Sequence, residues 1–469
     1  MKNLTFRLSI LIIAATFFNM VADANARDTV RVNFDQFIAL AQDRSPTLST
    51  QSQIVDLAEN RIQQAKNNRF LPNLNLTTAH GIVPGLKSFD ENITPGSFYL
   101  DPNLENDWEN WAVFTQAEVS SLQPIYTWGG ITSLIHAARK SAEAARFEFD
   151  SEKESFNLKL FELYQSALLA MEMNRLMEDA ISQLERAESE LEKLREQGNA
   201  SLEEKDIFEF YIFQAEFQAL RTEMQQNHDF IFRTWNLVLA GDDRTVYLPE
   251  ERFMDPIPIE IQNIDYYRRN ALQNRAELKG ITAAGQAAQH GVDAARSRYY
   301  PSLILGLSAG FGYTPNRPRQ QNPFIRNNSN FMSARIGFGL QQSLNFWQTR
   351  TQVQRSQIQQ HLARDFHDAA TEGILLEIHD NYRETMIAHS RIESKRNALT
   401  LSSEWLRTEQ IDLDLGFGDI KNLVDAVKKK MELEVDVKQM TFELNMKIAN
   451  LHHAAGLPLS NLIPDPSSP

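Results

Sequence analysis

The distribution of proline constrains this chain more than any other feature. No proline occurs between Pro124 and Pro249, and none between Pro323 and Pro458. Glycine is also scarce there, and Gly198 is the only one between residues 131 and 240. Proline breaks a helix interior and glycine weakens it, so both stretches are free to form very long helices.

Apolar residues in the first of these stretches recur at helical spacing, with charged residues between them. They include Leu158, Phe161, Ala167 and Leu168, and then Ile181, Leu184, Leu191 and Leu194. We expect a helix from about Trp128 to Gln197, on the order of 100 Å long at 1.5 Å per residue. A globular core cannot enclose such a helix, whereas a coiled coil or a helical tube can.

The chain is also an internal duplication. Residues 69–74, Arg-Phe-Leu-Pro-Asn-Leu, resemble residues 298–303, Arg-Tyr-Tyr-Pro-Ser-Leu, and Trp128 corresponds to Trp347. Gly198 corresponds to Gly416 in the same order. We therefore divide the chain into a first helix-strand-strand-helix repeat, an extended linker with three prolines, a second repeat and an irregular tail; these are residues 27–241, 242–262, 263–457 and 458–469.

Each repeat contains two candidate strands after a proline. In the second repeat, apolar residues from Leu303 to Tyr313 alternate with small ones, and Met332 to Leu340 do the same. The first repeat shows a weaker alternation over Leu74–His80 and Trp111–Leu122. About ten residues of alternation with aromatic ends is typical of membrane-spanning strands. An ordinary soluble hairpin remains the alternative.

Four strands are too few for a membrane barrel, which needs about eight. An open sheet edge is unstable in lipid because its backbone groups have no hydrogen-bond partners there. If these strands cross a membrane, several copies of the chain must build one barrel. The long helices need partners along their length in the same way, so the sequence predicts a homo-oligomer.

The N-terminus predicts export. Residues 1–26 combine Lys2 and Arg7, an apolar run and a small-residue end, which is the pattern of a signal peptide cleaved after Ala26. The remaining chain has 45 basic and 60 acidic residues and no cysteine. That balance argues against nucleic acid as a partner. The scattered histidines do not form a metal-ligand pattern, so we expect no metal site and no cofactor.

The assembled motifs resemble the TolC family of outer-membrane efflux proteins over nearly the whole chain. The segment Leu122-Gln123-Pro124-Ile125-Tyr126-Thr127-Trp128-Gly129-Gly130 is similar to the strand exit of that family. The segment Gly416-Phe417-Gly418-Asp419-Ile420, followed by Asp425, is similar to its periplasmic tip. The resemblance implies a mainly α-helical fold with a small transmembrane β part: a long periplasmic helical barrel continuous with a β-barrel shared by three subunits.

The resemblance further implies an exit duct in the outer membrane of a Gram-negative bacterium, for small molecules or secreted polypeptides. It implies a homotrimer in lipid that works with a periplasmic adaptor and an inner-membrane pump or ABC exporter, in efflux or type I secretion. The docking tips would be two turns, Gly198, Asn199 and Leu202 in the first and Gly416, Phe417, Gly418 and Ile420 in the second. Candidates for the periplasmic aperture are Asp425, Asn422, Glu204 and Asp206, although a solvated helix face explains these acids equally well.

Two other functions are compatible with parts of the sequence. A periplasmic coiled-coil scaffold or adaptor that spans no membrane explains the helices but not the alternating strands. A hydrolase rests on Gly306-Leu307-Ser308-Ala309-Gly310, which fits a nucleophile motif that needs a turn directly after a strand. Here the strand pattern continues past Ser308, so we expect no enzyme and no catalytic residue.

Overall fold

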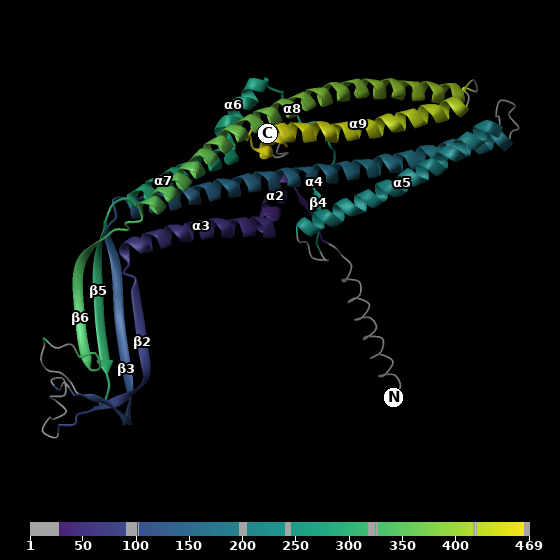
Figure 1. The fold of residues 1–469 in the computed structure, drawn as a ribbon. Helices are drawn as coiled ribbons and strands as arrows, with labels where there is room; N and C mark the ends of the chain where they lie inside the picture. The colour runs from purple at the N-terminus through teal and green to yellow at the C-terminus, as the bar shows by residue number, and fades with distance from the viewer. Residues whose placement is uncertain are drawn as a thin grey trace, which may run out of the picture. The chain divides into compact units, whose positions relative to one another are not determined.

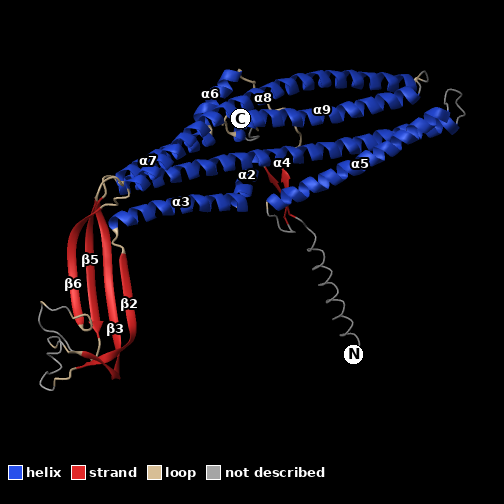
Figure 2. Cartoon of the chain, viewed as in Figure 1, coloured by secondary structure: helices blue, strands red, loops and turns tan. Residues whose placement is uncertain are grey.

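A computed structural model shows a mainly helical chain with a sheet part (Figures 1 and 2). It describes residues 28–90, 101, 103–196, 204–239, 245–317, 324, 327–415, 418 and 420–463. The expected signal cleavage after Ala26 lies outside the described residues. No helix in the described part of the chain is long and apolar enough to cross a membrane.

One order of elements occurs twice along the chain: two helices, two strands, a very long helix and a further helix. The first copy comprises α2 (Phe34–Asp43), α3 (Pro46–Phe70), β2 (Leu74–Lys87), β3 (Glu105–Tyr126), α4 (Gly130–Glu196) and α5 (Glu204–Val238). The second comprises α6 (Ile264–Asn274), α7 (Ala276–Ser297), β5 (Ser302–Tyr313), β6 (Phe331–Gln341), α8 (Phe346–Asp414) and α9 (Ile420–Ala454). The helix expected from Trp128 to Gln197 is confirmed to within two residues at each end.

The chain divides into two compact units. The first contains residues 1–52, 147–279 and 368–469, and the second contains residues 53–146 and 280–367. Long helices therefore contribute to both units, and each unit joins segments from both copies of the repeat.

The first unit contains a two-stranded parallel sheet that the sequence did not predict. Strand β1 (Asp28–Val32) pairs with β4 (Thr245–Pro249), which lies within the segment expected to be an extended linker. The expected tail also contains a short 3-10 helix, η3 (Leu459–Leu462), with its two leucines buried. Both segments pack on the helical core, in which the Phe37 and Trp235 rings stack 4.1 Å apart.

A buried arginine organises the junction of α6 and α7 in the same unit. The Arg275 side chain is 8% exposed, and its Nε and Nη2 donate to the two carboxylate oxygens of Glu277 at 2.6 and 2.7 Å. Its Nη1 donates to Glu377 of α8 and, at 3.3 Å, to the carbonyl of Ala454 at the end of α9. Burial opposes the positive charge, but these bonds outweigh it and raise the pKa of Arg275. The guanidinium therefore joins three helices at one point.

The second unit contains a four-stranded antiparallel sheet in the order β2-β3-β5-β6. Strands β3 and β5 come from different copies of the repeat, so their pairing joins the two copies. Strands β2 and β6 have 14 and 11 residues and form the edges, and β3 is longest with 22. Ser308 pairs with Ser120 and Arg335 in the middle of β5, so the turn required of a nucleophile motif is absent at this residue.

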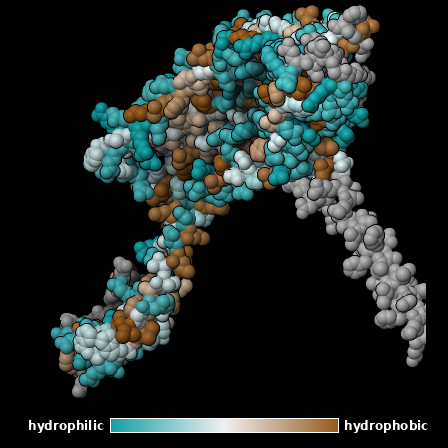
Figure 3. Space-filling model, turned by 90° about the vertical axis from the view of Figure 1, so that its right-hand side faces the viewer, coloured by the Kyte–Doolittle hydropathy of each residue, from teal (hydrophilic) through white to brown (hydrophobic). Residues whose placement is uncertain are grey.

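The register gives the sheet one apolar and one polar face. Directly opposed residues share a face, and the apolar face carries exposed side chains on every strand: Leu74, Leu76, Val113, Val119, Phe311, Met332, Ile336, Phe338 and Leu340. The opposite face carries Glu118, Ser120, Ser308, Arg335 and several glycines. Exposed hydrophobic residues appear brown on the face of the molecule drawn in Figure 3.

Strand β3 extends four residues past Leu122, where the expected strand ended, before the chain enters α4. Pro124 lies within β3, where the register with β5 shifts by one residue between Pro124 and Tyr126. The chain turns at Trp128 and Gly129, whose φ angles are 50° and 82°. Trp128 is held in this left-handed conformation by a hydrogen bond from its Nε1 to the carbonyl of Pro301, at 2.8 Å.

Candidate functional site

The ends of the two long helical hairpins pack against each other in the first unit. The C-terminal part of α4 and the N-terminal part of α5 meet the corresponding parts of α8 and α9. A shared cluster of buried side chains joins them: Met177, Leu184, Leu191, Phe210, Phe217, Leu406, Leu423, Ala426 and Val427. Because these residues recur at helical spacing, they bring fixed faces of the four helices together.

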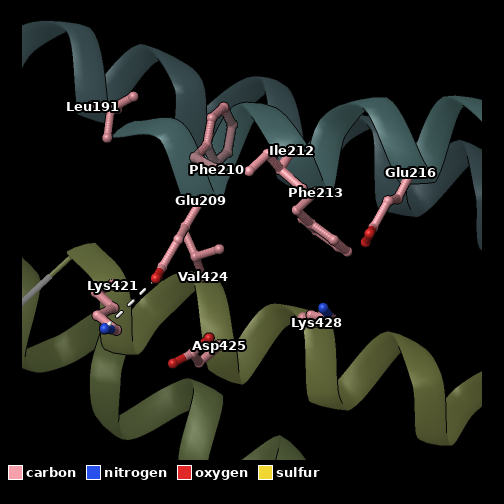
Figure 4. Close-up of a pocket in the computed structure, with 10 residues that line it drawn as sticks. All are labelled: Leu191, Glu209, Phe210, Ile212, Phe213, Glu216, Lys421, Val424, Asp425 and Lys428. Atoms are coloured by element: carbon pink, nitrogen blue, oxygen red, sulfur yellow. Dashed lines mark ion pairs between the residues drawn. The ribbon is translucent and has the colours of Figure 1, made fainter. Parts of the chain in front are cut away.

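A cavity of about 230 Å³ lies beside this cluster (Figure 4). Five apolar and five charged side chains line it: Leu191, Phe210, Ile212, Phe213 and Val424, with Glu209, Glu216, Lys421, Asp425 and Lys428. The lining thus contains three carboxylates and two lysines. With Leu191 contributed by α4, the lining joins the first hairpin to α9 of the second.

Two charged contacts connect α5 with α9 here. Lys421 Nζ lies 3.7 Å from a carboxylate oxygen of Glu209, as the dashed line in Figure 4 marks. The Lys428 ammonium lies 5.3 Å from the centre of the Phe213 ring. The Glu209 and Lys421 side chains are 45% and 38% exposed, so solvent screens their attraction to about 1 kcal/mol or less. These two contacts therefore add little to the apolar cluster that joins the hairpins.

Of the predicted aperture residues whose side chains the structure describes, Asp425 lines the cavity and the other two do not. Asp425 lines the cavity between Lys421 and Lys428 on α9, and its side chain is exposed. Asn422 and Glu204 are exposed and are not among the residues lining the cavity. Asp206 belongs to α5, and its side chain lies outside the described part of the chain. The two lysines offset the negative charge of Asp425, and neither lysine was among the site residues predicted from the sequence.

The structure describes two of the predicted tip residues, Gly418 and Ile420. The Gly418 amide donates to the carbonyl of Asp412 at 2.9 Å, which closes the last turn of α8. A Cβ atom at Gly418 would lie only 2.4 Å from the Leu413 amide nitrogen, so only glycine fits. Ile420 begins α9. The other predicted tip residues lie outside the described residues: Gly198, Asn199, Leu202, Gly416 and Phe417.

No group of three or more histidine, cysteine, aspartate or glutamate side chains in the described part of the chain could hold a metal ion. The adjacent His452 and His453 are partly buried at the end of α9. Burial lowers the pKa of both imidazoles, and for His453 the nearby Arg275 charge lowers it further. The neutral form of these histidines is therefore favoured at neutral pH.

Comparison with solved structures gives the same architecture. The outer-membrane channel OprN superposes with a TM-score of 0.70 at 16% identity, over 90% of this chain and 89% of that one. CusC gives 0.72 at 13% identity, over 92% and 93% of the two chains. The open-state MtrE outer-membrane channel of Neisseria gonorrhoeae gives 0.69 at 14%, over 91% and 89%.

The chain has the fold of these outer-membrane channels. The resemblance to the TolC family is thereby confirmed at the level of the fold. No protein-family model and no curated protein sequence matches the chain. The TolC-like fold thus occurs here at only 13–16% sequence identity to these channels.

Proposed function

We propose that this protein is an exit duct in the outer membrane, built from three copies of the chain. The observation that carries this proposal is the four-stranded sheet with an exposed apolar face and two unpaired edges. Water disfavours such a face, and lipid disfavours such edges. A closed barrel in a membrane satisfies both requirements, because β6 of one copy can pair with β2 of the next.

The strand lengths support a membrane setting. From Leu303 to Tyr313 the chain rises by ten residues, which is about 33 Å along the strand. At the tilt of about 40° usual in such barrels, this corresponds to about 25 Å along the membrane normal, which is the height of the apolar band. Three copies of four strands give a twelve-stranded barrel, and the long helices then form the periplasmic tube.

We propose that the duct is gated where the two hairpins meet at their tips. The weak pair between Glu209 and Lys421 and the contact between Lys428 and Phe213 add to the apolar cluster that packs α5 against α9 in the present conformation. A periplasmic adaptor that binds the tip turns would shift these contacts, and an inner-membrane pump or exporter would supply the cargo. A pore ring containing Asp425 would attract cations only weakly, because Lys421 and Lys428 flank it.

The first test is the conductance of the detergent-purified oligomer in a planar bilayer, with Asp425→Ala measured alongside. We expect insertion with small, mostly closed events in the wild type, and larger or longer openings in the variant. Insertion with no effect of the variant would retain the channel and remove Asp425 from the gate. Protein that is soluble without detergent and never inserts would refute the duct and favour a periplasmic scaffold.

A further inference from the structure

The helix-side end of the four-stranded sheet lacks acidic residues altogether, although the chain carries a net charge of −14. Residues 294–364 contain no aspartate or glutamate, and five of their nine arginines lie on the helix side of the strands, in residues 294–303 and 341–364. Residues 60–89 contain two lysines, two arginines and no acid. Both segments belong to the second unit, and both include the chain that leaves the sheet and enters the helices.

Four arginines lie closest to the strands on this side. Arg69 is the penultimate residue of α3, Arg296 is the penultimate residue of α7, Arg298 follows α7, and Arg350 is the fifth residue of α8. All four are exposed, and none forms an ion pair within the described part of the chain. Arg69 instead lies over the ring of Phe70, 5.2 Å from its centre, and approaches the Thr132 hydroxyl. We name these four residues the arginine collar.

Exposed aromatic side chains occupy the same level. The Trp128 ring lies 5.2 Å from Tyr126 and 5.1 Å from Tyr300, measured between ring centres. Phe70 and Trp347 are 68% and 67% exposed beside them. Aromatic rings with a polar atom favour the boundary between lipid and water. The arginine collar therefore lies at the height at which phospholipid headgroups would meet the protein.

The far end of the sheet has the opposite composition. Asp101, Glu105, Asp107 and Glu109 lie there, beside Lys87. Arg317 also lies at this end, where it donates to the carbonyl of Pro84. The charge is thus graded along the strands, from a purely basic end near the helices to an end that carries both signs and is rich in acids. A protein that needed only solubility at this end of the sheet would carry both signs of charge, as the rest of the chain does.

We propose that the arginine collar binds the anionic headgroups of phospholipids in the leaflet facing the periplasm. This inference rests on the proposed function, since it assumes that the sheet lies in the outer membrane. Lipid phosphate is complementary to arginine in charge and in hydrogen-bond geometry. A second copy of the chain is a poorer occupant, because rotation about one axis places the same acid-free segments at the same height.

The collar would act over a short range. Attraction between a basic segment and an anionic leaflet falls off within a Debye length, about 8 Å at physiological salt. Arg350 lies four residues inside α8, about 6 Å from the start of that helix, and the other three arginines lie four to six residues along the chain from the strand that follows them. The collar would fix the depth of the sheet in the bilayer and resist its displacement towards the exterior.

The test uses the full-length oligomer in vesicles of equimolar phosphatidylglycerol and phosphatidylcholine, with one lipid at a time brominated in its acyl chains. Bromine quenches nearby tryptophans. Trp108→Phe and Trp111→Phe remove those at the far end of the sheet, so that Trp128 and Trp347 report on the helix side. We expect phosphatidylglycerol to be preferred by about threefold or more.

Three collar residues are then replaced together, by Arg69→Gln, Arg298→Gln and Arg350→Gln. The preference should fall to about one, as it should for the unchanged collar in about 1 M NaCl. The matched control replaces three exposed arginines elsewhere on α8, by Arg391→Gln, Arg396→Gln and Arg407→Gln, and should keep the preference of the parent protein.

Equal quenching by the two lipids in the parent protein would overturn the collar and leave the membrane-embedded sheet intact. A preference that survives both the collar substitutions and high salt would also overturn it. Quenching by neither lipid would refute the proposed membrane location itself. The comparison at two salt concentrations needs no variant of the collar, so the inference stays testable even if the triple variant fails to fold.

Discussion

Replacing Arg275 by methionine should loosen the end of α9. The change removes three donor contacts to Glu277 and Glu377 and leaves the Ala454 carbonyl without its side-chain donor. Hydrogen bonds to charged groups contribute about 1.5–3 kcal/mol when well buried. The two glutamate side chains are 38% and 40% exposed and can rehydrate, so about 1 kcal/mol for each lost contact is the better value.

The three lost contacts therefore destabilise the site locally by about 3 kcal/mol before the unsatisfied carbonyl is counted, which corresponds to a rise in local opening of about 10²-fold or more. The readout is amide hydrogen exchange of the peptide covering residues 450–460, followed by mass spectrometry of the detergent-solubilised protein. Its amides include those of Ala455, Gly456 and Leu457, which close the last turn of α9. Exchange measures local opening and does not require reversible unfolding of the oligomer.

Two variants sharpen this prediction. Arg275→Lys keeps the charge but loses the bidentate geometry, so we expect an intermediate effect of about tenfold. Arg268→Met breaks a comparable but exposed pair with Asp265, 3.3 Å apart, and should change exchange less than about fivefold. Unchanged exchange at 450–460 in Arg275→Met, or an equal rise in Arg268→Met, would refute the reasoning.

Three further predictions concern the tips, the pH response and the sheet. Glu209→Lys should raise the open probability of the proposed duct by about 5- to 160-fold, since about 0.3–1 kcal/mol would be lost in each of its three proposed subunits, and adding Lys421→Glu should reverse the effect in single-channel recordings. Gly418→Ala should lower the thermal midpoint because its Cβ would clash with the α8 backbone, and a midpoint equal to that of the wild type would contradict that geometry. Burial lowers the folded-state pKa of His453, so the unfolded chain binds the proton more readily than the folded chain does. The contribution of neutral His453 to the free energy of unfolding should therefore be fully present above about pH 6.5 and be lost as the pH drops below it. A free energy of unfolding that rises on acidification would exclude this contribution. Ile336→Arg on the apolar sheet face should abolish insertion into bilayers while leaving the helical circular dichroism unchanged, since arginine near a bilayer midplane costs about 2–4 kcal/mol.

Local patterns made the helices predictable. Each long helix is specified by dozens of consecutive residues, with apolar positions in register and no proline, so the sequence placed the ends of α4 within two residues. The strands of the second repeat were equally clear because Leu303–Tyr313 alternate without interruption. Strand β3 was expected only from Trp111 to Leu122, because Pro124 and the polar residues near Glu105 obscure its ends.

Contacts between distant segments were not predictable in this way. Strands β1 and β4 have five residues each and pair across more than 200 residues, so neither carries a pattern of its own. The pairing of Glu209 with Lys421 also depends on which faces of two hairpins meet, and this follows from tertiary packing. Lys421 and Lys428 lie at i−4 and i+3 from Asp425, so helical spacing alone could have revealed that the acid is flanked by cations.

The pairing of β3 with β5 has a consequence for the order in which the chain can fold. Strand β3 is complete at Tyr126, but its partner begins at Ser302, after the whole of α4, α5 and the intervening segments. Closing so large a loop is entropically costly and slow. During synthesis, the β2–β3 hairpin must therefore wait with its apolar face and both edges uncovered, in a form prone to aggregation. The sheet can therefore fold only after the second repeat is complete. A holding chaperone that shields a two-stranded hairpin would act on this protein before the proposed oligomer can form.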